Sequence, residues 1–405
     1  MPTDLGPIRV SPNGRHFVTS DGAPFFWLGD TQWELVRSFS LDDARLILED
    51  RKAKGFTVLQ VMLAGVGDGT SPNFAGELPW LNNDPATPNE RYLGRVDEVI
   101  ALSREIGLVL VLGVYHQLHE SRITPTNVRE YAARIARRYA DVPNLIWTTY
   151  PRAEAQFVPV LCELAAGLRE GDGGAHLINV HPDPAPASSS FLQDEPWLDF
   201  HALQTHKFTD LIRPMIAADC AREPARPVVM AEGAYEGGPD NAFEYGFEVT
   251  PLWVRRQAWW TCLAGGHHTY GHGANYLLPP DWRDSLRAPG ATHMGIMREV
   301  LESLPEWWNL VPDQSLIARC EAGDPTMNAS ARAADGSCGL IYLGGAATIA
   351  VCTETLAAAD EIATTWISPT TGERLPASAE RSAGVSVVTT PAGWEDALLL
   401  LEPCS

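Results

Sequence analysis

The sequence predicts an α/β fold, a (β/α)8 TIM barrel, followed by a small antiparallel β-sandwich. Short apolar runs alternate with stretches of helical periodicity about eight times, which is the strand count of such a barrel. Beyond about residue 315 the chain instead shows short β-like runs separated by turn signals. The 405 residues suit one barrel of about 250 residues with a smaller module. We therefore predict a barrel with an N-terminal β-hairpin over residues 1–312 and a sandwich domain over residues 313–405.

The barrel strands are predicted where short apolar runs end in polar residues or glycine. Segment 108–115 is almost purely apolar, as expected for a parallel strand that is buried on both faces. The eight predicted strands are 24–30, 57–63, 108–115, 145–149, 176–181, 198–204, 227–232 and 265–270. A hairpin of residues 8–10 and 16–19, joined by Ser-Pro-Asn-Gly, is predicted to precede them.

Helices are predicted between these strands from apolar residues spaced three and four apart. Segment 41–55 has this spacing and stops at Gly55, a residue typical of the position just past a helix. The further predicted helices are 95–107, 126–139, 157–169, 208–220, 251–262 and 294–304. The segment 64–91 is too long and too polar for an ordinary connection, which favours a functional role.

The sandwich is predicted from five short β-like runs in the C-terminal part of the chain. They are 339–343, 348–352, 363–367, 385–389 and 397–401. Turn signals separate them at 334–336, 371–373 and 391–393.

The amino-acid composition limits the classes of molecule that the protein is expected to bind. The chain has 30 Lys and Arg against 51 Asp and Glu, a formal charge of −21, so it repels phosphate backbones and nucleic acid is not expected as a ligand. Seven cysteines lie far apart without a C-x-x-C pair, which favours reduced thiols. No signal-peptide pattern and no membrane-spanning apolar stretch is visible, so we expect a cytoplasmic protein without a membrane partner. The sequence leaves the oligomeric state open.

Polar and aromatic residues gather where the predicted strands end, and catalytic groups of a TIM barrel lie at the carboxyl ends of its strands. In strand order these residues are Asp30, Gln32 and Trp33; Asp68, Asn73, Phe74 and Trp80; Tyr115, His116, Gln117 and His119; Tyr150, Arg152 and Glu154; His181 and Asp183; Gln204 and His206; Glu232, Tyr235 and Glu236; His267, His268, Tyr270 and His272. Sugars need such a mixture, because aromatic faces cover their C–H faces and polar groups bind their hydroxyls. The sequence therefore favours a carbohydrate ligand.

Glu232 is the sharpest single candidate. It ends the apolar run 227–232, and a carboxylate there costs desolvation free energy unless a function or an ion pair compensates for it. A metal site is a weaker alternative, since the neighbouring His267 and His268 would point to opposite faces of a strand. No Gly-rich phosphate loop follows the first predicted strand, which disfavours a dinucleotide, and no G-x-S-x-G elbow supports a serine hydrolase. We therefore expect neither a cofactor nor a metal ion.

Several motifs together resemble the apiosidase-like glycoside hydrolases, which are (β/α)8 barrels followed by a small β-sandwich of the collagen-binding type. The resemblance covers nearly the whole chain and rests on segments 26–33, 144–147, 196–200, 270–272 and 307–315. The family nucleophile is a glutamate at the end of strand seven in a pattern like Gly-Glu-Pro-x-Tyr-Glu. The matching stretch is Ala231-Glu-Gly-Ala-Tyr-Glu236, so the resemblance implies that Glu232 is the nucleophile, although glycine replaces the proline.

The acid/base of the resembled family has no direct counterpart. In the family it is the aspartate of a Gly-Gly-Asp motif, five positions after the tryptophan of strand four, and that position here is Arg152. Arginine stays protonated and cannot act as a general acid. Glu154, two residues further on, is the predicted replacement, with Asp68, Glu120 and Asp183 as further stand-ins.

We therefore predict a retaining glycoside hydrolase that cleaves a glycosidic bond in a plant or bacterial glycan or glycoside. Glu232 would attack the anomeric carbon and Glu154 would protonate the leaving oxygen. The predicted substrate-binding residues are Asp30, Trp33, Phe74, Trp80, His116, Tyr150, Arg152, Gln204, His206, Tyr235, Glu236, Tyr270 and His272. The alternatives are a carbohydrate-binding pseudoenzyme that holds acidic sugars through Arg152, and a metal-dependent enzyme that uses the histidines.

Overall fold

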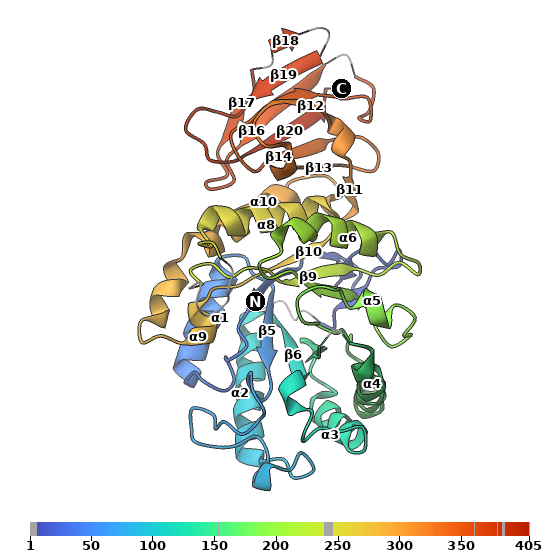
Figure 1. Ribbon diagram of the computed structural model, residues 1–405, viewed down its shortest axis with the longest axis vertical. Coiled ribbons are helices and arrows are strands. Elements are labelled where there is room, and N and C mark those ends of the chain that lie inside the picture. The colour runs from blue at the N-terminus through green and yellow to red at the C-terminus, as the bar shows by residue number, and fades with distance from the viewer. Residues whose placement is uncertain are drawn as a thin grey trace.

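The barrel is built from one curled sheet of seven parallel strands. The computed structural model describes residues 6–152, 154–238, 246–359, 361–378, 380–382 and 385–404. The strand order is β7-β6-β5-β4-β10-β9-β8. The bounds are β4 (Leu28–Thr31), β5 (Val58–Met62), β6 (Val109–His116), β7 (Leu145–Tyr150), β8 (His201–Gln204), β9 (Val228–Glu232) and β10 (His267–Tyr270). The predicted fold class is confirmed, with helices covering this sheet and antiparallel sheets following it (Figure 1).

The helices follow local signals in the sequence. Ser40 caps the first helix by accepting a hydrogen bond from the amide of Asp43, and Gly107 ends the second with a φ of 81°. The helices are α1 (Leu41–Ala53), α2 (Glu90–Ile106), α3 (Val128–Tyr139), α4 (Val158–Asp172), α5 (Ser189–Leu192), α6 (Ile212–Cys220), α8 (Pro251–Leu263), α9 (Ala274–Leu277) and α10 (Pro289–Glu302). Short 3-10 turns lie at Leu81–Asn83, Gln117–His119, Ala155–Phe157, Thr209–Leu211, Trp282–Arg287, Trp307–Asn309, Gln314–Leu316 and Pro325–Met327.

The fifth predicted barrel strand, 176–181, is corrected to an irregular segment. The segment lies beside β7 and is joined to it by three backbone hydrogen bonds. One of them runs from the amide of His181 to the carbonyl of Thr149 at 2.9 Å. On its other side the amide of Ile178 donates to the Asp199 carboxylate at 2.6 Å. Because a side chain takes the place of a strand backbone there, a regular ladder does not form, although the segment still fills the gap between β7 and β8.

The first predicted barrel strand, 24–30, is also corrected, because it divides between two sheets. β3 (Pro24–Phe25) joins β2 (Phe17–Val18) and β1 (Arg9–Val10) in a small antiparallel sheet, and β4 alone enters the barrel. This small sheet confirms the predicted hairpin and adds a strand to it. Phe17 packs against the rings of Trp27 and Phe200, with ring centres 4.9 and 5.1 Å apart.

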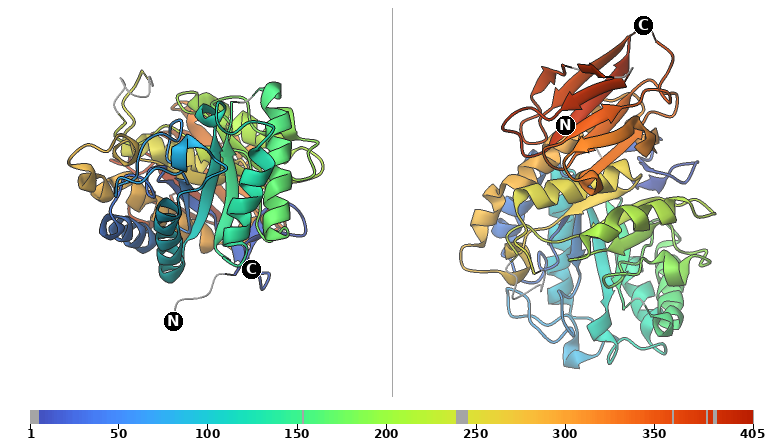
Figure 2. Two further views of the ribbon diagram at one scale, coloured as in Figure 1. Left: turned by 90° about the horizontal axis from the view of Figure 1, so that it is seen from below. Right: turned by 45° about the horizontal axis from the view of Figure 1, so that its top comes forward.

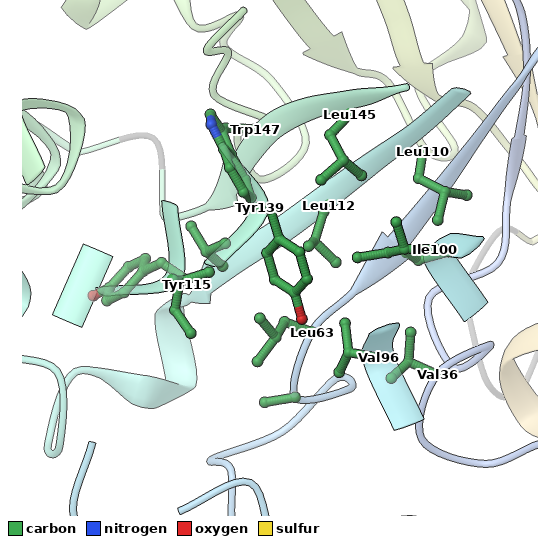
Figure 3. Close-up of a cluster of buried hydrophobic side chains, with 14 of the residues drawn as sticks. Val36, Leu63, Val96, Ile100, Leu110, Leu112, Tyr115, Tyr139, Leu145 and Trp147 are labelled. Atoms are coloured by element: carbon green, nitrogen blue, oxygen red, sulfur yellow. The ribbon is translucent and has the colours of Figure 1, made fainter. Parts of the chain in front are cut away.

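The core is divided by the alternation of side chains along each strand. On β6, Val109 and Val111 pack in the barrel interior, whereas Leu110 and Leu112 belong to the cluster that includes helix residues such as Ile100 of α2. Figure 3 shows this outer cluster between the strands and α2 and α3, with Leu110, Leu112, Leu145 and Trp147 drawn from the sheet. Both faces of β6 are therefore apolar along most of its length, and its polar residue, His116, stands at its end.

The C-terminal part consists of two antiparallel sheets that pack face to face. The first has the order β11-β13-β14-β20-β16-β17 and the second β12-β15-β19-β18. Their bounds are β11 (Val311–Pro312), β12 (Ile317–Ala322), β13 (Asn328–Arg332), β14 (Gly339–Leu343), β15 (Thr348–Val351), β16 (Ile362–Ile367), β17 (Arg374–Pro376), β18 (Glu380–Ser382), β19 (Val385–Thr389) and β20 (Ala397–Pro403). All five predicted runs are strands, and a buried apolar cluster joins the two sheets.

The C-terminal sheets lie against the helices α8 and α10 of the barrel (Figures 1 and 2). Residues of β14 and β20, such as Leu340 and Leu398, share one buried cluster with Trp259 of α8 and Met297 of α10. The predicted boundary at residue 312 falls at the end of β11, which already pairs with β13. The division into residues 1–312 and 313–405 stays a prediction.

Candidate active site

A cavity of about 340 Å³ opens where the barrel strands end. Five of the predicted site residues stand at or just past strand ends and line it, namely Trp33, His116, Tyr150, Gln204 and Glu232. Two more predicted residues, His206 and Tyr235, line it from the loops that follow. The remaining lining residues are Met62, Val66, Gln117, Leu118, Pro184 and Tyr276. Strand ends from almost every part of the barrel sheet thus converge on one pocket, as in other TIM barrels.

Glu232 lies in the wall of this cavity with 7% of its surface exposed. Its Oε2 accepts a hydrogen bond from the indole Nε1–H of Trp33 at 3.2 Å, and its Oε1 accepts one from Nε2 of Gln204 at 2.9 Å. The imidazole Nε2 of His181 lies 3.5 Å from Oε2. Each carboxylate oxygen therefore has a donor, which offsets the cost of burying the charge.

Register explains why Gln204 reaches Glu232. The two are partners in the parallel pairing of β8 with β9, and an irregularity between Leu203 and Gln204 shifts the pairing just before this point. Bulges of this kind redirect side chains at the ends of strands.

Tyr150 stands between two histidine rings. Its ring stacks on His116 at 5.1 Å and on His181 at 4.6 Å, with interplanar angles of 19° and 25°. His116 is its partner in the pairing of β6 with β7, and His181 follows β7 on the other side. The Tyr150 hydroxyl donates to Oε1 of Gln204 at 2.7 Å.

Burial sets the protonation states of this stack. Burial, and next the charge of Glu232, raises the pKa of Tyr150 well above its ordinary value. Burial, and next the charge of His181, lowers the pKa of His116 to about 4. Tyr150 is therefore a neutral phenol and His116 a neutral imidazole near pH 7.

Asp183 is the half-buried carboxyl beside the cavity. Nε2 of Gln117, which lines the cavity, donates to its Oδ1 at 3.2 Å, and the next residue, Pro184, is part of the cavity wall. Burial raises the pKa of Asp183, the charges of His181 and Arg152 oppose this shift, and the charge of Glu232 adds to it. The ionisation of Asp183 thus depends on its burial and on the charges around it, that of Glu232 included.

Asp30 does not reach the cavity. It is fully buried and accepts hydrogen bonds from Nε of Arg51 at 2.7 Å and from Nε2 of Gln32 at 2.6 Å. Arg51 lies on α1, so Asp30 faces the helix layer and not the mouth of the barrel. The expectation that Asp30 binds a sugar hydroxyl is therefore corrected, because its carboxylate is occupied by a structural ion pair.

Glu236, Tyr270 and His272 lie away from the Glu232 cavity. The Tyr270 hydroxyl donates to Glu236 at 2.5 Å, and the amide of Gly290 also donates to that carboxylate, at 3.1 Å. Glu236 and His272 line a separate cavity of about 510 Å³. Their predicted role in the same sugar site is corrected, because Tyr270 is buried against Phe56 and Arg51 and the loops after β9 and β10 place Glu236 and His272 at the second cavity.

The two aromatic residues of segment 64–91 do not cover the cavity. Phe74 is 66% exposed and is not part of the cavity wall. Trp80 is buried, with its ring edge-on to His119 and Tyr131. Both expected contacts with the sugar are corrected, since Trp80 fills the core between its own loop and α3.

The structure does not bring Arg152 and Glu154 to the cavity wall. Both are exposed, and Oε2 of Glu154 accepts a hydrogen bond from Gln156 at 2.5 Å. The residue between them lies outside the described residues. No contact of Arg152 with the cavity supports the recognition of an acidic sugar.

Sequence reasoning did not select some residues that the structure places at the site. His181 and Gln117 were noted as strand-end residues only, and Tyr276 was not considered. Tyr276 lies on the short helix α9, six residues beyond β10. The available signal was an aromatic residue in the loop after the last barrel strand.

The described residues offer neither a cluster of metal ligands nor a helix that could span a membrane. Within the described ranges, no three His, Cys, Asp or Glu side chains gather in a way that could hold a metal ion. No helix in this part of the chain is long and apolar enough to cross a bilayer.

Known families match both parts of the chain. The sequence model described as "Apiosidase-like, catalytic domain" matches residues 11–309. The chain belongs to the apiosidase-like family. Residues 311–402 match a second family described as "Putative collagen-binding domain of a collagenase". No curated protein matches the chain.

Solved structures share the fold of this apiosidase-like chain. One named "Glycoside hydrolase" has a TM-score of 0.88 at 24% identity and covers 100% of this chain and 98% of its own. A glycoside hydrolase family 5 protein from Bacteroides vulgatus has a TM-score of 0.88 at 23% identity, with coverages of 100% and 95%. A β-L-arabinopyranosidase variant from Geobacillus stearothermophilus, solved with arabinose, has a TM-score of 0.56 at 12% identity and covers 94% and 97%. These likenesses establish the arrangement of barrel and C-terminal sheets.

Proposed function

We propose that the protein is a retaining glycoside hydrolase in which Glu232 is the nucleophile. The observation that carries this proposal is the Glu232 carboxylate, which lies in the wall of a small cavity with a hydrogen-bond donor on each oxygen. Trp33 and Gln204 stabilise the ionised form that a nucleophile needs, and they leave the carboxylate beside the open space. Membership of the apiosidase-like family supports the same chemistry.

We further propose Asp183 as the acid/base, in place of Glu154. Burial raises the pKa of Asp183, as a general acid requires, and Glu154 is exposed away from the cavity. Gln117 orients the Asp183 carboxyl from the cavity wall. The two carboxyls thus have different environments, since Glu232 accepts a hydrogen bond on each oxygen and burial raises the pKa of Asp183.

The reaction then takes two steps. Glu232 attacks the anomeric carbon while the bond to the leaving oxygen breaks, and Asp183 gives its proton to that oxygen. A water molecule next attacks the same carbon, Asp183 takes the proton of this water, and Glu232 is released. The sugar leaves with the anomeric configuration it had in the substrate.

The proposed substrate is a carbohydrate, and only a short portion of it enters the pocket. The cavity of about 340 Å³ is at the small end of the range of about 300–1,000 Å³ for small-molecule sites. Its walls combine aromatic rings with polar groups, in the mixture that sugar rings need. We therefore propose a terminal sugar or a small glycoside of a plant or bacterial glycan.

Product analysis tests the proposal. Purified protein is incubated with a panel of plant and bacterial oligosaccharides, and the first anomer released is identified by proton NMR. Retention of configuration is expected, with a loss of at least about a thousandfold in Glu232→Gln and recovery of Glu232→Ala by azide. Binding without cleavage by the wild-type protein would instead favour the pseudoenzyme.

The acid assignment is tested separately with two variants. Asp183→Asn should slow cleavage of substrates with poor leaving groups far more than that of nitrophenyl glycosides, because only the former need protonation. Glu154→Gln is the comparison. If Glu154→Gln shows this leaving-group dependence and Asp183→Asn does not, the acid role returns to Glu154.

A further inference from the structure

The hydroxyl of Tyr150 has no proton left to donate to a sugar, because it already donates its proton to Gln204. It donates to Oε1 of Gln204 at 2.7 Å, and Nε2 of the same amide donates to Oε1 of Glu232 at 2.9 Å. Gln204 is 2% exposed, so bulk water does not readily replace either hydrogen-bond partner of its amide. The three side chains therefore form one directed chain of hydrogen bonds that ends on the nucleophile.

The direction of this chain follows from the two ends of an amide. An amide offers a carbonyl acceptor at one end and an NH2 donor at the other. A carboxylate only accepts, so Gln204 must turn its NH2 to Glu232 and its carbonyl oxygen away. The Tyr150 hydroxyl satisfies that buried carbonyl oxygen, and without it the oxygen would lose its partner at a cost in free energy.

The ring of Tyr150 is held in place on three sides. His116 and His181 stack on its two faces, and Trp33 approaches nearly perpendicular, at 88° and 5.9 Å. Trp33 is also a donor to Glu232, so the ring and the nucleophile share a neighbour. This packing fixes where the hydroxyl points.

We propose that Tyr150 is a positioning residue that acts through Gln204 to orient the Glu232 carboxylate and keep it ionised. The inference rests on the proposed function, since it assigns Tyr150 a part in preparing the nucleophile. It gives Tyr150 a different part from the substrate-binding role predicted from the sequence. The two faces of the Tyr150 ring are covered by the histidines, so the ring belongs to the cavity wall without offering a free face to a sugar.

Other groups that titrate or carry charge also face Glu232, and a test must separate them from the relay. Besides the Tyr150 phenol of the relay itself, they are His181 from the segment after β7, His116 at the end of β6, Asp183, and the phenol of Tyr276. The indole N–H of Trp33 contacts Glu232 itself, so its NMR resonance responds to protonation of that carboxylate. The part of the response that Glu232→Gln abolishes belongs to Glu232.

The experiment follows the Trp33 indole resonance against pH in the full-length, 15N-labelled protein. The chain has 13 tryptophans, and Trp33→Phe identifies the resonance by its loss. In Tyr150→Phe the midpoint of the Glu232-dependent change should move about half a pH unit higher, because a weaker hydrogen bond to the ionised form favours protonation. Gln204→Met should move it higher by about one unit, and the double variant should match Gln204→Met alone.

Tyr131→Phe is the matched control, because it also removes a buried hydroxyl that donates to a carbonyl, here that of Val114. Its midpoint should equal that of the wild type. An unchanged midpoint in Gln204→Met, or additive shifts in the double variant, would overturn the relay. This readout needs no substrate, so a failed relay is distinguished from a failed glycosidase, which shows itself when Glu232→Gln retains activity.

Discussion

Arg255 of α8 and Asp396, just before β20, form a buried ion pair between the barrel and the C-terminal sheets. Nε of Arg255 donates to Oδ2 at 2.9 Å and Nη2 donates to Oδ1 at 2.8 Å, with both side chains no more than 2% exposed. The Tyr342 hydroxyl donates to the same carboxylate at 2.7 Å, and its ring stacks on Trp259. The two parts of the chain are thus joined by polar contacts inside an apolar interface.

Breaking this pair should cost stability. Asp396→Asn is expected to lower the free energy of unfolding by about 3 kcal/mol, because it leaves the buried Arg255 charge with only the exposed carboxylate of Glu395, 3.3 Å from its Nη2. Urea unfolding followed by circular dichroism measures the loss. Glu105→Gln, which removes an exposed partner of Arg45, is the control and should cost under about 1 kcal/mol. Equal small losses in both variants would show that the buried pair contributes little.

The loop after Glu232 should depend on Gln257 of α8. Its Oε1 accepts from the amide of Ala234 at 2.8 Å and its Nε2 donates to the carbonyl of the same residue at 3.1 Å. Gln257→Leu removes both bonds two residues beyond the nucleophile, and we expect kcat to fall about tenfold or more with the fold retained. Steady-state kinetics measures this. Gln193→Leu is the control, because its amide bonds only an exposed carbonyl, and a fall of the same size there would contradict the prediction.

The pH profile should follow Asp183. An acid donates only when protonated, so kcat/KM should fall as the pH rises through the pKa of Asp183, which burial has raised. Gln117 stabilises the ionised form through its hydrogen bond, so Gln117→Leu should raise this pKa further. We expect the basic limb of kcat/KM to move about half a pH unit higher. A basic limb that stays in place, or moves lower, would contradict the acid role of Asp183.

Asp30 should be a stability residue and not a sugar ligand. Its carboxylate is fully buried with Arg51, so Asp30→Asn is expected to lower the free energy of unfolding by about 3–5 kcal/mol. At a temperature where the variant stays folded, KM should remain near the wild-type value. Thermal unfolding and kinetics measured on the same sample check both statements. A large rise in KM with unchanged stability would restore the sugar-binding role.

The sequence predicted the strands more completely than the site. A parallel strand buried on both faces must be apolar along its length, so 108–115 and 227–232 were visible as runs. The strand 339–343 was predicted at its observed bounds, Gly339–Leu343. Segment 176–181 was mistaken for a strand, because its apolar content is that of one while its pairing on one side depends on the distant Asp199.

The sequence by itself predicted that Glu232 would stand at a strand end, since the short apolar run that precedes it is typical of a buried strand. Tertiary structure decided which side chains meet it. The contacts of Glu232 with Gln204 and of Tyr150 with His116 follow from the register between neighbouring strands, and the two pairs are 28 and 34 residues apart in the sequence. Asp30 and Trp33 lie three residues apart on the same strand end, yet one faces α1 and the other the cavity. The register between two strands and the direction in which a side chain points depend on how the sheet curls and where its bulges lie. Local sequence does not encode these long-range relationships.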